Sequence, residues 1–239
     1  YHVVYQDAQR WLKEGIHDAL FPMMYFQGNN FYPFALDWKE NDGKRWIIPG
    51  LGIYFLSPRE QDWPLDEIVR QIHFTRQIKL NGQAYFRNRF LLDNTKGVLD
   101  ELEENFYTYP ALIPPMTWSD SIPPSVPSHP SVQQIANGKL RMSWQASADN
   151  SNQSVVYHLY GSDTYPVDIK QPQNLIATHL IANEYEYTAK LPWLQKRYFA
   201  VTAADRFGNE SAPLTLNTVS DMDIPLLNKG NMLYLPEIK

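Results

Sequence analysis

Three long apolar runs in the first half of the chain alternate with segments of helical periodicity. The runs cover residues 19–26, 45–55 and 83–90. The first run is apolar without alternation, a pattern typical of a parallel strand covered on both faces. Amphipathic spacing predicts helices over residues 6–15, 65–80 and 95–107. The long loop over residues 27–42 is expected to be functional or to contain a short helix at 32–41, with Pro33 in its first turn. This order of strands and helices predicts a β/α architecture.

The pattern changes to short alternating strands from Ser131 onward. Strands are predicted over residues 139–146, 155–161, 184–189, 198–204 and 212–219, with a hairpin turn at Asn137-Gly138. Strands at this spacing predict an antiparallel β-sandwich. A proline-rich stretch before them has the composition of a stiff spacer. The predicted organisation is therefore a β/α domain (1–118), a linker (119–130), an all-β domain (131–219) and a C-terminal tail (220–239) with a candidate strand at 232–235.

Composition narrows the function classes. The net charge of -5 argues against a nucleic-acid partner, which selects for a clustered basic face. No apolar run is long enough to cross a membrane. Cysteine is absent and the histidines are scattered, so we expect neither a disulfide framework, a metal site nor a cofactor. Aromatic residues make up 14% of the chain. Most are expected in the core, and the alternative is stacking platforms for sugar rings.

Candidate binding residues follow from the strand ends. In β/α folds, chemistry takes place beyond the carboxyl ends of the strands. Trp38, in the segment after the first strand, is predicted either to pack as core or to line a cleft. An arginine at a strand end is either an ion-pair partner or a hydrogen-bond fork for a ligand. The predicted substrate-contacting residues are Tyr25, Gln27, Trp38, Tyr54, Arg87 and Asn88.

Candidate catalytic residues are harder to find. General acid–base catalysis at a strand end would need acidic side chains placed close together there. The strand ends offer Glu60 and Asp93 only at some distance along the chain. His17 precedes the first strand. It therefore lies at the amino end of the strands, the end that in barrels contributes to stability and not to catalysis. The catalytic residues therefore stay unassigned.

The second half resembles a fibronectin type III domain over residues 127–219. The motifs that carry the resemblance are Leu140-x-x-x-Trp144, Tyr157-x-x-Tyr160, Leu191 and Tyr198-x-x-Val201-x-Ala203-x-Asp205-x-x-Gly208-Asn209-Glu210-Ser211. The resemblance implies an accessory or spacer module. It also implies that Trp144 is a core residue and Asp205 a turn residue.

The first half resembles the C-terminal part of the bacterial barrels called glycosyl hydrolase-like 10. The matching motifs are Tyr5-Gln6-Asp7-x-x-x-Trp11-Leu12-x-x-Gly15, Phe21-Pro22-Met23-Met24-Tyr25, Gly50-Leu51-Gly52-Ile53-Tyr54, Glu67-Ile68-x-x-Gln71-Ile72 and Gly82-Gln83-Ala84-Tyr85-Phe86. The resemblance implies the last strands of a TIM-type (β/α)8 barrel. The remaining strands and the catalytic carboxylates are then expected upstream of Tyr1. It also implies a secreted or cell-envelope location in a bacterium, either periplasmic or as a surface lipoprotein.

Three functions follow from these expectations. The chain is either part of a glycoside hydrolase acting on a cell-envelope or dietary polysaccharide, a non-catalytic glycan-binding protein, or a structural envelope protein. The fold alone cannot choose among them. An incomplete barrel would leave open sheet edges, which tend to pair. We therefore also predict a homodimer through the open barrel edge.

Overall fold

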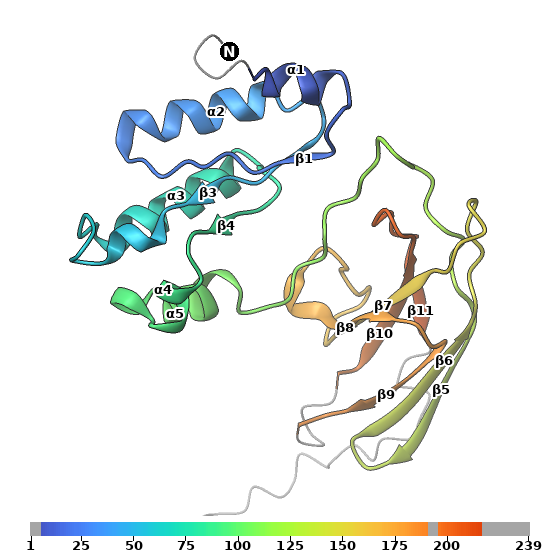
Figure 1. The fold of residues 1–239 in the computed structure, drawn as a ribbon. Helices are drawn as coiled ribbons and strands as arrows, with labels where there is room; N and C mark the ends of the chain where they lie inside the picture. Colours follow the sequence, from blue (N-terminus) through green and yellow to red (C-terminus); the bar gives the residue numbers. More distant parts are fainter. Residues whose placement is uncertain (1–5, 191–195, 217–239) are drawn as a thin grey trace, which may run out of the picture. The chain divides into compact units, whose positions relative to one another are not determined.

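The computed structural model describes residues 6–190 and 196–216. The chain divides into two compact units, residues 1–121 and 122–239, each described by itself (Figure 1). Tyr5 and Leu191 of the motifs above, and the candidate strand at 232–235, lie outside the described residues. None of the described helices is long and apolar enough to cross a membrane.

Three α-helices of the first unit are α1 (Ala8–Lys13), α2 (Tyr32–Glu40) and α3 (Leu65–Gln77). The carboxylate of Asp7 caps α1 by accepting a hydrogen bond from the Arg10 backbone N–H at 3.1 Å. Gly15, with φ of +71°, turns the chain after this helix. Pro33 lies in the first turn of α2, and Pro64 precedes α3, where a missing N–H costs little. The structure confirms these three predicted helices with shorter ends.

Four two-residue strands form parallel pairs in this unit: β1 (Ala19–Leu20), β2 (Trp46–Ile47), β3 (Gly50–Leu51) and β4 (Ala84–Tyr85). β1 pairs with β2, and β3 pairs with β4. A single parallel bridge between Met23 and Gly50 joins the segment that follows β1 to the start of β3. The parallel direction was predicted.

The predicted strands over 19–26 and 45–55 are wrong in length. Pro22 and Pro49 lie inside the two runs and have no N–H to donate to a ladder. The first run is also not covered on both faces, because Met23 is 73% exposed and Phe26 is 53% exposed.

The third predicted strand and the last predicted helix need correction as well. The segment after β4 turns at Asn88 into a short helix, α4 (Arg89–Leu92), so Arg87 and Asn88 are not in a strand. The predicted helix 95–107 is three short pieces. The remaining helical segments of this unit are η1 (Gly28–Asn30), η2 (Ile53–Leu56), η3 (Thr95–Gly97), α5 (Val98–Glu101) and the π-helical η4 (Leu102–Phe106).

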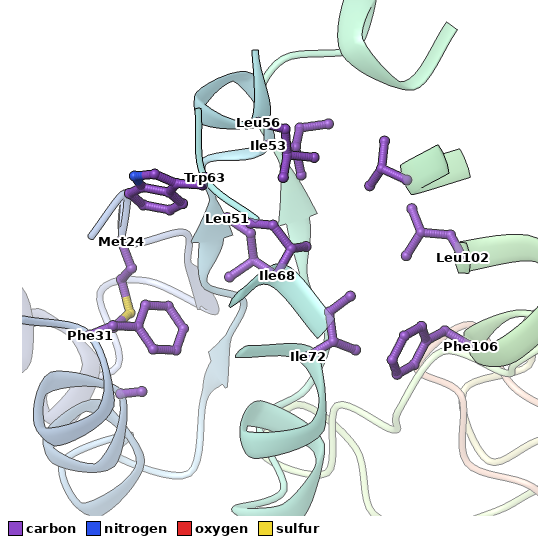
Figure 2. Close-up of a cluster of buried hydrophobic side chains, with 12 residues drawn as sticks. Met24, Phe31, Leu51, Ile53, Leu56, Trp63, Ile68, Ile72, Leu102 and Phe106 are labelled. Atoms are coloured by element: carbon purple, nitrogen blue, oxygen red, sulfur yellow. The ribbon is translucent and has the colours of Figure 1, made fainter. Parts of the chain in front are cut away.

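The core of the first unit gathers side chains from strands and helices (Figure 2). Leu51 from β3 is fully buried in it, as are Phe31 and Ile68. The described residues form two parallel pairs and no closed barrel. The first unit is therefore a mixed unit of helices and short parallel strand pairs.

The second unit consists of two antiparallel sheets in the orders β5-β6-β9 and β11-β10-β7-β8. The strands are β5 (Ser128–Ala136), β6 (Lys139–Gln145), β7 (Val156–Ser162), β8 (Leu175–Leu180), β9 (Glu184–Thr188), β10 (Tyr198–Ala204) and β11 (Leu214–Leu216), and a short helix, η5 (Pro172–Asn174), precedes β8. The turn at Asn137-Gly138 joins β5 to β6 as predicted. β8 was not predicted, and β5 begins at Ser128, inside the predicted linker.

Inward-facing residues from both sheets build the second core. Leu140, Met142 and Trp144 alternate with exposed or half-exposed residues along β6. Trp144 is 5% exposed and packs edge-on against Tyr157, with ring centroids 5.3 Å apart. The structure therefore confirms Trp144 as a core residue.

Asp205 organises the turn after β10. Its Oδ1 accepts backbone hydrogen bonds from Phe207 and Asn209, each at 2.8 Å. Its Oδ2 accepts a third from the side-chain amide of Asn209 at 2.7 Å. Gly208, with φ of +80°, supplies the left-handed residue of this turn. Asp205 is therefore a turn residue, as predicted.

Candidate functional site

Three aromatic rings meet just beyond the parallel strands of the first unit. Tyr25 stacks on Phe86, with ring centroids 5.3 Å apart and planes 15° from parallel. Tyr54 lies edge-on to both, at 5.8 Å from Tyr25 and 5.6 Å from Phe86. We call these three residues the aromatic cluster. Each comes from a different predicted strand end, so the strand ends converge as expected.

Backbone hydrogen bonds fix two members of this cluster relative to the strands. Phe86 N–H donates to the Leu51 carbonyl at 2.9 Å, which continues the pairing of β3 with β4. The Phe86 carbonyl accepts a hydrogen bond from Tyr54 N–H at 3.1 Å. The Phe86–Arg87 peptide bond is cis. Phe86 and Tyr54 are therefore held in place by backbone hydrogen bonds that extend the β3–β4 pair.

Two glycines make room for the third member. A Cβ at Gly50 would lie 3.1 Å from Cε1 of Tyr25. A Cβ at Gly52 would lie 3.1 Å from the Tyr25 Cβ and 3.2 Å from Cδ2 of Phe55. All three distances are shorter than ordinary carbon–carbon contacts. The tyrosine can therefore pack against this backbone because both positions lack a side chain.

Polar groups border the aromatic cluster. The Arg87 guanidinium lies 3.8 Å from a carboxylate oxygen of Glu60 and 5.5 Å from the centre of the Phe90 ring. Arg87 is 55% and Glu60 37% exposed, so both groups reach solvent. Desolvation raises the pKa of Tyr25, with a smaller contribution from Tyr54. The Tyr25 hydroxyl is therefore protonated at neutral pH and can donate a hydrogen bond.

The same site includes a network that sequence analysis missed. Gln71 on α3 donates to the Phe26 carbonyl at 2.9 Å and to Oε1 of Glu67 at 3.0 Å. Glu67 is 5% exposed and accepts further hydrogen bonds from Tyr32 at 3.3 Å and from Arg70 at 2.7 Å. This network ties the loop after Tyr25 to α3. The spacing of Glu67 and Gln71, four residues apart on a helix, was the available signal.

The remaining predicted site residues differ in their surroundings. Gln27 and Asn88 are exposed and follow the same strand ends. Trp38 is not brought to the aromatic cluster: it is half-buried on α2 and packs against the core. It also lines an apolar surface pocket of about 630 Å³, together with Met23, Phe26 and Phe34.

This arrangement is equipped for binding more than for acid–base chemistry. Glu60 reaches the site as the partner of Arg87. Asp93 instead pairs with Arg89 at 3.2 Å. Within residues 6–190 and 196–216, no three or more histidine or carboxylate side chains are grouped as metal ligands. Aromatic rings, a guanidinium and amide side chains suit the apolar faces and hydroxyl groups of a sugar.

Comparison with known proteins gives one distant curated relative and several structural neighbours. No family model matches the chain. A protein described as glycosyl hydrolase YngK from Bacillus subtilis (strain 168) is 29% identical over 222 residues. That match covers 88% of this chain but 43% of the relative, so the chain spans less than half of the relative's length.

The structural neighbours match about two fifths of the chain. A fibronectin type III domain of human fibronectin type III domain containing protein 3 is 18% identical, with a TM-score of 0.28, and covers 42% of this chain and 93% of that domain. The FN5 domain of Drosophila Lar is 15% identical, with a TM-score of 0.25, and covers 40% of this chain and 96% of that domain. The comparisons thus give a distant sequence similarity to a protein described as a glycosyl hydrolase, and partial alignments to fibronectin type III domains with TM-scores below 0.3.

Proposed function

We propose that the chain is the C-terminal part of a glycoside hydrolase-like protein that acts on a cell-envelope or dietary polysaccharide. The observation that carries the proposal is the aromatic cluster of Tyr25, Tyr54 and Phe86, with Arg87 at its border. The distant relationship to a protein named as a glycosyl hydrolase supports the same family-level function. In this proposal, the second unit is an accessory module.

The proposed role of the first unit is substrate contact. Tyr25 and Tyr54 would cover the C–H face of a sugar ring, while Arg87, Asn88 and Gln27 would bond its hydroxyl groups. In this proposal the catalytic acid and base come from residues upstream of Tyr1, because Glu60, which the described residues bring to the cluster, is the ion-pair partner of Arg87. The alternative is a non-catalytic glycan-binding or structural envelope protein that has the same aromatic cluster and the same bordering polar residues. We propose a bacterial secreted or cell-envelope location for either.

Replacing Tyr25 or Arg87 by alanine is expected to weaken polysaccharide binding. Each variant removes either a ring face or a charged hydrogen-bond donor, so affinity should fall at least about tenfold. The measurement is a polysaccharide and glycan-array screen of the whole chain, followed by calorimetric titration of the strongest binder. Tyr109→Ala and Arg197→Ala are matched controls, since both residues are exposed and lie outside the cluster.

Two results would contradict this site. Binding that both variants retain would place the sugar elsewhere on the chain. Hydrolysis by this chain alone, abolished by Glu60→Gln, would contradict the proposal that the catalytic carboxylates lie upstream. Circular dichroism of each variant separates lost binding from lost folding.

When these residues are produced without any upstream strands, we propose that the open edge of β1 pairs with a second copy of the chain. Among the described residues, β1 is bonded only to β2 in its sheet, and Met23 and Phe26 beside it are exposed apolar side chains. Unpaired strand edges with apolar neighbours favour association. Analytical ultracentrifugation should show a dimer that Met23→Lys converts to a monomer, while Leu92→Lys, at an equally exposed leucine outside β1, leaves it intact. A wild-type monomer at concentrations up to roughly 100 μM would rule out a stable dimer of the expected strength.

A further inference from the structure

A second pocket lies at the amino end of β2, away from the aromatic cluster. Its volume is about 520 Å³, and it is lined by Lys39, Asp42, Lys44, Arg45, Trp46 and Trp118, among others. Arg45 and Trp46 lie where β2 begins, whereas the aromatic cluster follows the carboxyl ends of β3 and β4. The pocket is therefore separate from the proposed polysaccharide site.

The charge of this pocket is positive in a chain of net negative charge. Asp42 is already occupied: its Oδ2 pairs with Lys39 at 2.8 Å, and its Oδ1 accepts the Lys44 backbone N–H at 2.7 Å. Within the described part of the chain, Lys44 and Arg45 have no carboxylate within ion-pair distance. Two positive charges at the pocket are thus not offset by a protein anion.

The Trp118 ring packs against the Arg45 guanidinium. Its central carbon lies 4.9 Å from the centre of the Trp118 ring, and Trp118 is itself anchored by a 2.8 Å hydrogen bond from its indole N–H to Asp18. A Cβ at Gly15 would lie 2.9 Å from Nη2 of Arg45, so the glycine leaves room for the guanidinium. An arginine fixed in this way loses little conformational freedom when it binds a ligand.

The pocket also has surplus hydrogen-bond donors. Nε of Arg45 and Nε1 of Trp46 are buried and have no hydrogen-bond partner among the described residues. Both atoms are donors only. Buried donors without acceptors are costly, so a ligand that supplies acceptor oxygens would relieve two of them at once. Trp46 and Trp118 meet edge to face at 5.7 Å and add apolar walls beside these donors.

We propose that this pocket binds a ring-bearing carboxylate, of the kind that a uronic acid residue presents. A carboxylate matches the fork of an arginine and neutralises the charges of Arg45 and Lys44. A ring attached to that carboxylate can lie against the two tryptophans. This pocket is distinct from the aromatic cluster, and its ligand does not depend on whether the cluster binds a polysaccharide.

The test is calorimetric titration of the whole chain with D-glucuronate, D-glucose and inorganic phosphate. Glucuronate should bind, and glucose should bind at least about tenfold more weakly because it lacks the charged acceptor. Lys44→Gln and Arg45→Gln should each weaken glucuronate binding by roughly tenfold. Lys170→Gln, an exposed lysine of the second unit, is the control and should leave binding unchanged.

Several outcomes would overturn the proposal. Glucose binding as tight as glucuronate would show that charge is not recognised. Phosphate binding as tight as glucuronate would show that the ring is not recognised. Unchanged glucuronate affinity in Lys44→Gln would place the ligand elsewhere. The exposed position of Lys44 keeps this test valid even if Arg45→Gln fails to fold.

Discussion

Replacing Leu51 by alanine is expected to destabilise the first unit by about 2–5 kcal/mol, the usual cost of emptying a well-packed site. Leu51 is fully buried, and it belongs to the cluster that also contains Phe31, Ile68 and Ile72 (Figure 2). β3 and β4 are only two residues long. Few ladder hydrogen bonds support this strand pair, so its position depends on such packing. Truncating Leu51 leaves a cavity in this core, and the cavity adds to the cost of the lost burial.

The measurement is urea unfolding of the whole chain, followed by ¹H–¹⁵N spectra so that each unit reports its own transition. Leu92→Ala is the matched control, because Leu92 is 75% exposed and its truncation should change stability by less than about 0.5 kcal/mol. An equally small effect of Leu51→Ala would contradict the packing described for this core.

Replacing Trp144 by alanine is expected to cost the second unit about 3–5 kcal/mol, the range for large aromatic residues in cores. Trp144 is 5% exposed, lies on the central strand of the three-stranded sheet and packs against Tyr157. Its indole N–H is buried without a hydrogen-bond partner among the described residues. Phenylalanine keeps a ring and removes that donor, so Trp144→Phe should cost clearly less than alanine.

The same unfolding experiment compares the two substitutions at Trp144. Tyr165→Ala serves as a control in this unit, since Tyr165 is 62% exposed. Equal losses for Trp144→Phe and Trp144→Ala would mean that ring packing contributes little. In that case the tryptophan would stabilise the unit through some interaction other than ring packing.

The fold was predictable where one local rule dominates. Helix α3 has regular apolar spacing and a proline before it, and strands β6 and β9 of the second unit alternate cleanly between their two faces. The predicted strands of the first unit were too long because apolar character was weighed above Pro22 and Pro49. β8 was missed because its residues are mostly half-buried on both faces and show no alternation.

The sequence predicted only those parts of the candidate site that lie at the ends of parallel strands, because such ends meet at one edge of a sheet. Parallel strand ends placed Tyr25, Tyr54 and Arg87 in one region. The stacking partner Phe86 and the partner of Arg87, Glu60, depend on contacts between segments far apart in sequence. For Trp38 both core packing and a place in a cleft were expected, and on α2 it packs against the core instead of joining the aromatic cluster. Local patterns carry no information about such distant pairings.

The glycine against the Tyr25 ring links two positions of the sequence in their evolution. The ring lies where a side chain at Gly50 would begin. A homologue that carries a larger residue at position 50 should therefore have exchanged the tyrosine for a smaller side chain, or lost the ring stacking on Phe86. At Gly52 the nearest atoms are Cβ of Tyr25 and a ring carbon of Phe55, so a smaller side chain at position 25 would not make room there. Substitutions at residues 25 and 50 are expected to covary, although the two are far apart in the chain. Covariation of this kind would trace the aromatic cluster among sequences whose overall similarity is low.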